Sequence, residues 1–145
     1  MKTAGAEPVG RFNVEVELSN EDDLTLAQAG HLDPAKVRRL TLEGVVDSGA
    51  ARLVIPAHAA KKLGLREAGK VRVRYADRRT AMRPRVEKIR LKLQGRDSVF
   101  AATVEPKRDT ALIGAIVLEE LDFLVDCTKG RLYPRDPDYV VSEEE

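Results

Sequence analysis

The stretch Gly44–Pro56, GVVDSGAARLVIP, places a carboxylate, a hydroxyl group and a glycine between two apolar runs. Asp, Ser and Gly are common turn residues, so a turn at the end of a strand is the simplest interpretation of these three alone. The context favours chemistry instead. Strand-like residues follow, and a second strand-then-glycine unit, ALIGA, lies far downstream. Asp47 is therefore a candidate for acid–base chemistry.

Together these residues resemble the retropepsin-like aspartic proteases (clan AA), and most of all the bacterial single-domain members. The resemblance covers about residues 12–134. It depends on VVDSGAARLVIP…AAKKLGL, on YADRRT at the flap position and on ALIGAIVLEELDFLVDCTKGRLYP, in this order. It implies an all-β, acid-protease closed barrel with one or two short helices, acting as a homodimeric aspartic endopeptidase.

The resemblance also implies a mechanism. In this family two aspartates share one proton, because like charges a few ångströms apart cannot both ionise. One activates a water molecule, and the other protonates or polarises the scissile carbonyl. Catalysis is thereby assigned to Asp47, which explains the interrupted strand: the carboxylate is placed in a dry cleft. Gly49 lets the backbone approach this carboxylate, and the Ser48 hydroxyl holds the two active loops together.

Further site residues follow from the same resemblance. Ala50 completes the active-site loop, the flap over the substrate comprises Ala76, Asp77 and Arg78, and the close packing opposite the active loop comprises Ile113 and Gly114. The catalytic water is the only cofactor implied. The implied partners are a peptide or protein substrate and a second copy of the chain. No membrane partner is expected, and nucleic acid is the lesser alternative discussed below.

The number of motifs indicates the dimer. Asp109, Asp122 and Asp126 lack the following glycine, so the chain has one Asp-Ser-Gly and no second one. A dyad then requires two chains that meet on a two-fold axis, and a monomer should be inert. By analogy with the family, the terminal segments, including the expected hairpin over 123–134, form the interface.

Three positions bear on activity. Ala50 provides no hydroxyl to support the carboxylate, which favours a mildly acidic or near-neutral optimum. Ala51 stands where relatives often carry Ser, Thr or Asp. Arg78 stands where the flap turn of relatives commonly has glycine, and a positive φ there would strain it. These departures favour a rival interpretation, a catalytically idle dimerisation or peptide-binding module.

Length and composition fit one domain. The chain has 145 residues, 43% of them apolar, with 25 basic and 24 acidic side chains. We expect the domain to span residues 1–145, with flexible tails over 1–10 and 136–145. Few aromatic residues predict a core of Val, Leu, Ile and Ala. A single cysteine and the absence of a secretory or membrane-spanning segment favour a cytoplasmic protein.

The order of elements follows from hydrophobic periodicity and turn residues. Short strands are expected throughout, with a long surface connection over 19–36 that contains at most a short helical turn. Short helices are expected after Pro56, ending near Gly64, and after Gly114, ending near Leu121.

A basic block over 61–92 carries 13 basic and 3 acidic side chains. The simplest interpretation is a solvated strand face. A nucleic-acid-binding β-barrel is a lesser alternative, because no set of aromatic side chains accompanies the charges. In a third interpretation, Arg78, Arg79 and Arg83 bias the cleft toward acidic peptides.

His31 and His58 lie in different elements with no ligand at metal-binding spacing, so no metal site is predicted. Cys127 has no local histidine partner and is interpreted as an incidental thiol.

Overall fold

The computed structural model describes residues 11–145, so the expected flexible segment over 1–10 lies outside the described residues. The elements in chain order are β1 (Arg11–Asn20), α1 (Glu21–Gln28), the 3₁₀ helix η1 (Pro34–Lys36), β2 (Arg39–Asp47), β3 (Val54–Pro56), α2 (Ala57–Lys62), β4 (Glu67–Arg74), β5 (Thr80–Leu93), β6 (Arg96–Glu105), β7 (Ala111–Ile113), α3 (Ala115–Leu121), β8 (Phe123–Asp126) and β9 (Arg131–Pro134).

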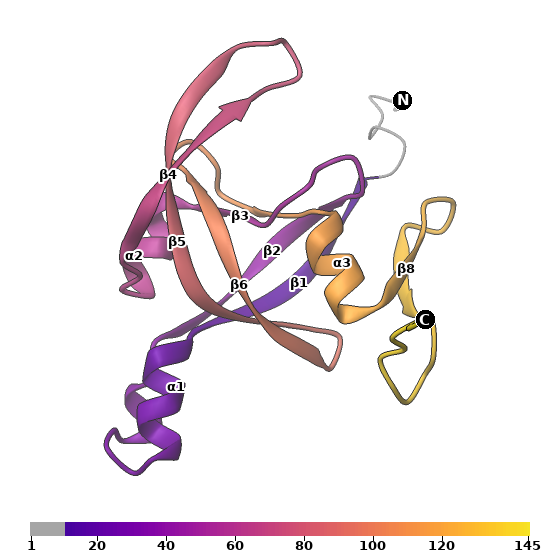
Figure 1. Cartoon of the computed structure of the whole chain (residues 1–145). Coiled ribbons are helices and arrows are strands. Elements are labelled where there is room, and N and C mark those ends of the chain that lie inside the picture. The colour runs from indigo at the N-terminus through magenta and orange to yellow at the C-terminus, as the bar shows by residue number, and fades with distance from the viewer. Residues whose placement is uncertain (1–10) are drawn as a thin grey trace.

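Six strands close into a barrel. Neighbouring strands follow the order β1-β2-β7-β3-β6-β5, and β5 returns to pair with β1. β4 pairs with β5 alone in this sheet, so the β4–β5 hairpin projects beyond the barrel (Figure 1). The all-β fold is therefore confirmed, with the active-site motif at the end of a barrel strand.

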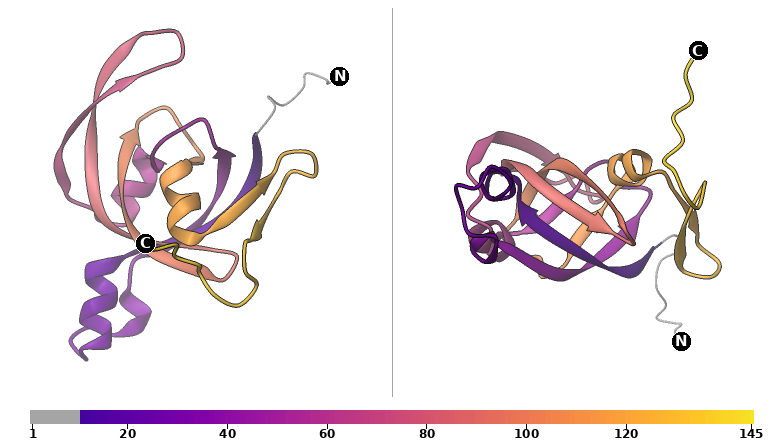
Figure 2. Two further views of the ribbon diagram at one scale, coloured as in Figure 1. Left: turned by 45° about the vertical axis from the view of Figure 1, so that its right-hand side comes forward. Right: turned by 90° about the horizontal axis from the view of Figure 1, so that it is seen from below.

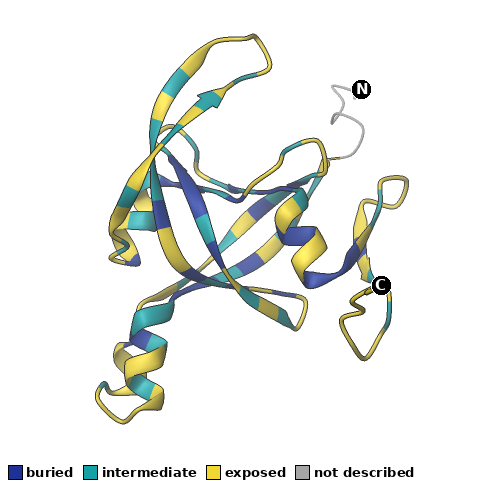
Figure 3. Ribbon diagram, viewed as in Figure 1, coloured by how far each residue is buried: buried dark blue, intermediate teal, exposed yellow. Residues whose placement is uncertain are grey.

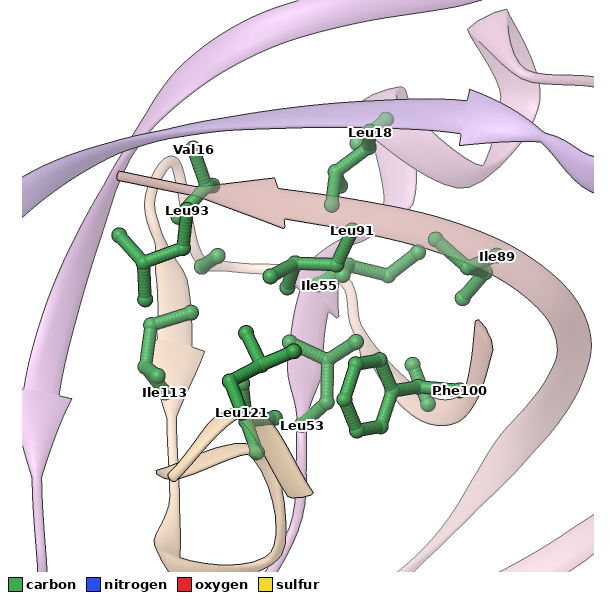
Figure 4. Packing of buried hydrophobic residues seen from close by; sticks show 14 of the residues in the cluster. Val16, Leu18, Leu53, Ile55, Ile89, Leu91, Leu93, Phe100, Ile113 and Leu121 are labelled. Carbon is green, nitrogen blue, oxygen red and sulfur yellow. The ribbon is translucent and has the colours of Figure 1, made fainter. Parts of the chain in front are cut away.

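The barrel interior is aliphatic, as the composition predicts. Leu18, Ile55, Leu91 and Ile113 come from four different strands and are fully buried (Figure 4). Phe100 and Phe123 are the buried aromatic residues of this core within residues 11–145, and Phe12 packs against it while partly buried. Burial of these side chains is the main favourable contribution to folding, at roughly 1.5–3 kcal/mol for each large side chain.

The register between β1 and β2 fixes where the motif lies. The two strands pair antiparallel over their whole shared length, from Arg11 opposite Asp47 to Ser19 opposite Arg39. A slip of one residue would turn Val16 and Leu18 away from the core, so the apolar pattern specifies this register. Arg11 is consequently the cross-strand neighbour of Asp47.

The segment over 19–36 differs from the expectation of a surface connection, because it contains the two-turn helix α1. Asn20 caps the helix, its side chain accepting a hydrogen bond from the Asp23 backbone N–H at 3.0 Å. Three acidic residues in the first turn also favour the helix N-terminus. Within residues 11–145 there are thus three α-helices, where one or two were expected.

The absence of an apolar stripe explains why α1 escaped prediction. Asp23 is the one buried residue of the helix, and the other residues of α1 are half-buried or exposed (Figure 3). The other two helices agree with the sequence: α2 is followed by Gly64 at a φ of +65°, and α3 ends at Leu121.

The C-terminal segment lies beside α3. β8 and β9 form the predicted hairpin, separate from the barrel sheet, and the last residues extend away from the barrel (Figure 2). Arg96 donates to the carbonyl oxygens of Leu121 and Tyr139, and the Val141 N–H donates to Asp122. These bonds connect the segment to the barrel, while its flexibility over 136–145 stays a prediction.

The pairing of Asp23 with Arg38 predicts how stability depends on pH. The Asp23 carboxylate accepts from the Arg38 Nε at 2.8 Å and backbone N–H at 2.9 Å, and hydrogen bonding from Arg38 lowers its pKa. A carboxyl group whose pKa is lower in the folded state stabilises above its unfolded pKa and loses that contribution as the pH falls, here between about pH 5 and 2.

We expect Asp23→Asn to lower the free energy of unfolding by about 1–2 kcal/mol at neutral pH, and the loss to shrink toward pH 2. Urea denaturation across this pH range measures it, with the exposed Asp109→Asn as control. A loss independent of pH would contradict the assignment.

Candidate active site

The active-site loop follows β2 directly. Asp47 is the last residue of β2, and its side chain is 17% exposed. Its Oδ1 accepts a hydrogen bond from the Gly49 N–H at 2.9 Å, and its carbonyl oxygen accepts from the Ala50 N–H at 3.0 Å. A β-carbon on residue 49 would lie 3.2 Å from this Oδ1. The backbone at Gly49 therefore approaches the carboxylate closely.

Arg11 holds the other oxygen of Asp47. The guanidinium Nε donates to Oδ2 at 3.0 Å, and an Nη lies 2.9 Å from the same oxygen. Sequence reasoning missed this ion pair, because it depends on the β1–β2 register. Ser48 is exposed and makes no side-chain hydrogen bond within residues 11–145, so its expected role between two loops stays a prediction.

β7 brings Ile113 and Gly114 beside this loop. It pairs parallel with β2, Ile113 lying opposite Val46, and Ile113 is fully buried. A β-carbon on residue 114 would lie 2.5 Å from the Arg52 carbonyl oxygen and 2.8 Å from that of Ala50. No side chain fits against backbone at such distances.

The start of α3 completes the contact. The Ala115 N–H donates to the Ala50 carbonyl oxygen at 2.8 Å, and the Ile116 N–H donates to that of Ala51 at 3.0 Å. Two N–H groups in the first turn of α3, which have no partner within the helix, thus donate to two carbonyl oxygens of the loop. Ile113 and Gly114 therefore pack closely against the active loop, as the sequence predicted.

The predicted flap corresponds to the β4–β5 hairpin. Its turn is closed by hydrogen bonds between Tyr75 and Arg79 and between Arg78 and Tyr75, both at 2.9 Å. Arg78 adopts a φ of +71°, a left-handed conformation that disfavours a side chain. Asp77 accepts from the Arg79 backbone and guanidinium, which lowers the pKa of its carboxyl group.

A cleft of about 600 Å³ separates the loop from the hairpin. Asp47, Gly49 and Ala50 line it from the loop, and Ala76 lines it from the hairpin, whereas Asp77 and Arg78 do not. The loop and one flap residue therefore border one cavity. Arg78, Arg79 and Arg83, expected near the cleft, lie outside its lining.

A polar network joins the hairpin turn, β5 and the end of β6. The Tyr75 hydroxyl donates to Glu105 at 2.7 Å, and the Arg83 Nε lies 2.9 Å from the same carboxylate. Arg83 also donates to the Tyr75 hydroxyl, and its pKa is raised chiefly by this bond. The network connects Tyr75 at the hairpin turn and Arg83 of β5 to the last residue of β6.

The remaining candidates lie apart from the cleft. His31 follows α1, His58 lies in α2, and Cys127 is exposed in the β8–β9 turn. Within the described chain no three His, Cys, Asp or Glu side chains gather as metal ligands. The helices over 11–145 all lack the length and apolarity needed to cross a membrane.

A closed β-barrel whose Asp-Ser-Gly loop borders a cleft under a projecting hairpin defines the aspartic-protease class of domain. The comparison with known families agrees: the aspartyl protease family model matches residues 33–117, more than half of the chain. The chain belongs to this family, which is of the retropepsin-like clan. No curated protein matches it.

We expect Gly114→Ala to lower the free energy of unfolding by about 2–3 kcal/mol, because its β-carbon would displace the loop backbone. Gly30→Ala is the matched control. Gly30 has a φ of +81° and open space around it, so only the conformational penalty of about 1 kcal/mol applies. Thermal and urea denaturation measure both, and equal losses would contradict a steric role for position 114.

Proposed function

We propose that the chain is an aspartic endopeptidase whose catalytic dyad is formed by Asp47 and its counterpart in a second copy. The observation that carries the proposal is the position of Asp47, bordering the cleft at the start of an Asp-Ser-Gly loop. Membership of the aspartyl protease family supports the reaction class. The chain has one such loop, and a dyad needs two, so the number of motifs supports a dimer.

The proposed reaction uses one carboxylate and one carboxylic acid. The carboxylate removes a proton from a water molecule, and the resulting hydroxide attacks the carbonyl carbon of the peptide bond. The protonated partner donates its proton to the carbonyl oxygen, giving a tetrahedral diol. Protonation of the amide nitrogen then allows the carbon–nitrogen bond to break, which releases a carboxylate and an amine.

In this proposal the Arg11 guanidinium withdraws from Asp47 when the two loops meet. The ion pair joins a guanidinium side chain that is 47% exposed to a carboxylate that is 17% exposed. Such a partly exposed pair contributes only about 1 kcal/mol or less, so formation of the dyad can displace it.

We expect purified wild-type protein to cleave members of a mixed peptide library across about pH 4–7.5, the range in which a shared-proton dyad works, and Asp47→Asn to cleave none. Mass spectrometry identifies the cleaved bonds. Equal results for the two proteins, with the wild type folded and dimeric, would eliminate the endopeptidase.

The rival is a catalytically idle peptide-binding module. Arg78 favours it, because its φ of +71° strains the flap turn that would close over a substrate. The same library separates the two, since an idle module retains peptides on wild type and Asp47→Asn alike without cleaving them.

We propose the β8–β9 hairpin as part of the dimer interface. Leu124 and Tyr133 are cross-strand partners on it and remain 42% and 41% exposed. A cross-strand pair of large apolar side chains left open in one chain is suited to burial against a second copy.

We expect Leu124→Glu to weaken the dimer at least tenfold in Kd by sedimentation and to reduce cleavage in parallel, with the fold intact by circular dichroism. Val99→Glu, at a residue 39% exposed on β6, is the control and should change neither. A dimer unaffected by Leu124→Glu would remove the hairpin from the interface.

A further inference from the structure

Arginine dominates the charge of the cleft. Five arginines and two acidic residues line it: Arg11, Arg52, Arg72, Arg74, Arg108, Asp47 and Glu105. Both acidic side chains already have cationic partners, since Arg11 pairs with Asp47 and Arg83 pairs with Glu105. No carboxylate of the lining is left to neutralise the other arginines.

Four of these arginines carry positive charge that no described carboxylate compensates. Arg52, Arg72 and Arg74 are exposed and make no ion pair within residues 11–145. Arg108 donates to the carbonyl oxygen and hydroxyl of Thr110, both at 3.0 Å, so its partners are neutral. The four come from the active loop, from β4 and from the segment before β7, so they border the cleft on several sides.

Apolar side chains occupy other parts of the same cleft. Val54 and Leu112 are cross-strand neighbours on β3 and β7. Val71 and Val73 alternate with Arg72 and Arg74 along β4, so the half-buried valines and the exposed arginines lie on opposite faces of that strand at the border of the cleft. The residues around the cleft therefore combine an apolar part with arginines, of which Arg52 and Arg108 come from outside β4. A ligand that fits it has apolar groups and negative charges together.

We infer that the cleft selects peptides in which Asp or Glu side chains flank apolar residues at the cleaved bond. The inference deepens the proposed endopeptidase and rests on it. Guanidinium groups bind carboxylates through charge-assisted, often bidentate hydrogen bonds. Unpaired positive charge lining a cleft also attracts anionic substrates before contact and disfavours cationic ones.

The test is cleavage of a peptide library in which every apolar core sequence occurs twice, once with flanking Glu and once with flanking Gln. Competition within one mixture gives the ratio of kcat/KM for each pair. We expect the Glu peptides to be preferred by about tenfold at low salt, because each exposed ion pair gives roughly a two- to fivefold effect and several act together. The ratio should fall as salt screens the charges.

Variants connect the preference to the arginines. Arg52→Gln combined with Arg74→Gln should reduce the Glu-to-Gln ratio to about two or three, since two of the four uncompensated charges are removed. Arg39→Gln is the matched control: Arg39 is exposed at the opposite end of β2 from Asp47 and outside the cleft lining, so the ratio should not change.

Each outcome separates the inference from the proposed function. Equal cleavage of Glu and Gln peptides overturns the inference and leaves the endopeptidase standing. If a folded dimer cleaves neither, the endopeptidase fails, and capture of the two peptide pools by Asp47→Asn protein decides the inference: enrichment of the Glu pool supports it and equal capture overturns it. A competing oligonucleotide gives the last outcome. If it displaces the Glu peptides at a concentration below the one at which those peptides themselves bind, the arginines are assigned to nucleic acid and the inference is overturned.

Discussion

The site depends on one steric constraint, the contact between Gly114 and the backbone of the active loop. Parallel pairing of β7 with β2 brings this glycine against the loop. A β-carbon at position 114 would lie within 3 Å of the carbonyl oxygens of Ala50 and Arg52. The first N–H groups of α3 then bind the loop carbonyls. Barrel, loop and helix are thereby joined at one point, in the segment that directly follows Asp47.

Charge in this molecule is neutralised locally at some positions and left uncompensated at others. The basic block over 61–92 has a large formal surplus, and three of its members pair with acids from elsewhere in the chain: Arg83, Lys88 and Arg90. Arg90 bonds to both Glu21 and Asp97, and Lys88 lies 3.3 Å from Asp22. The strand face is thus compensated only in part. Two of the uncompensated members of the block, Arg72 and Arg74, are among the residues that line the cleft.

The sequence predicted what local patterns encode. Alternating apolar residues predicted β1 and β2, and the Asp-Ser-Gly loop and the second glycine unit predicted the family. It failed where an outcome depends on register or on distant elements. The Arg11–Asp47 pair requires the β1–β2 register, and the arginines of the cleft come from segments far apart in the chain. α1 lacked an apolar stripe, although Asn20 followed by three acids was a usable capping signal.

The ion pair between Arg11 and Asp47 has a consequence for where and when the proposed enzyme works. In a single chain the carboxylate is paired with its own first strand and has no second aspartate beside it, so the proposed enzyme would be inactive until two copies meet. Activation then consists of an encounter between two copies. When most of the protein is monomeric, the concentration of the proposed active dimer rises with the square of the total protein concentration. Dilution, rather than a separate inhibitor, would return the protein to its silent form.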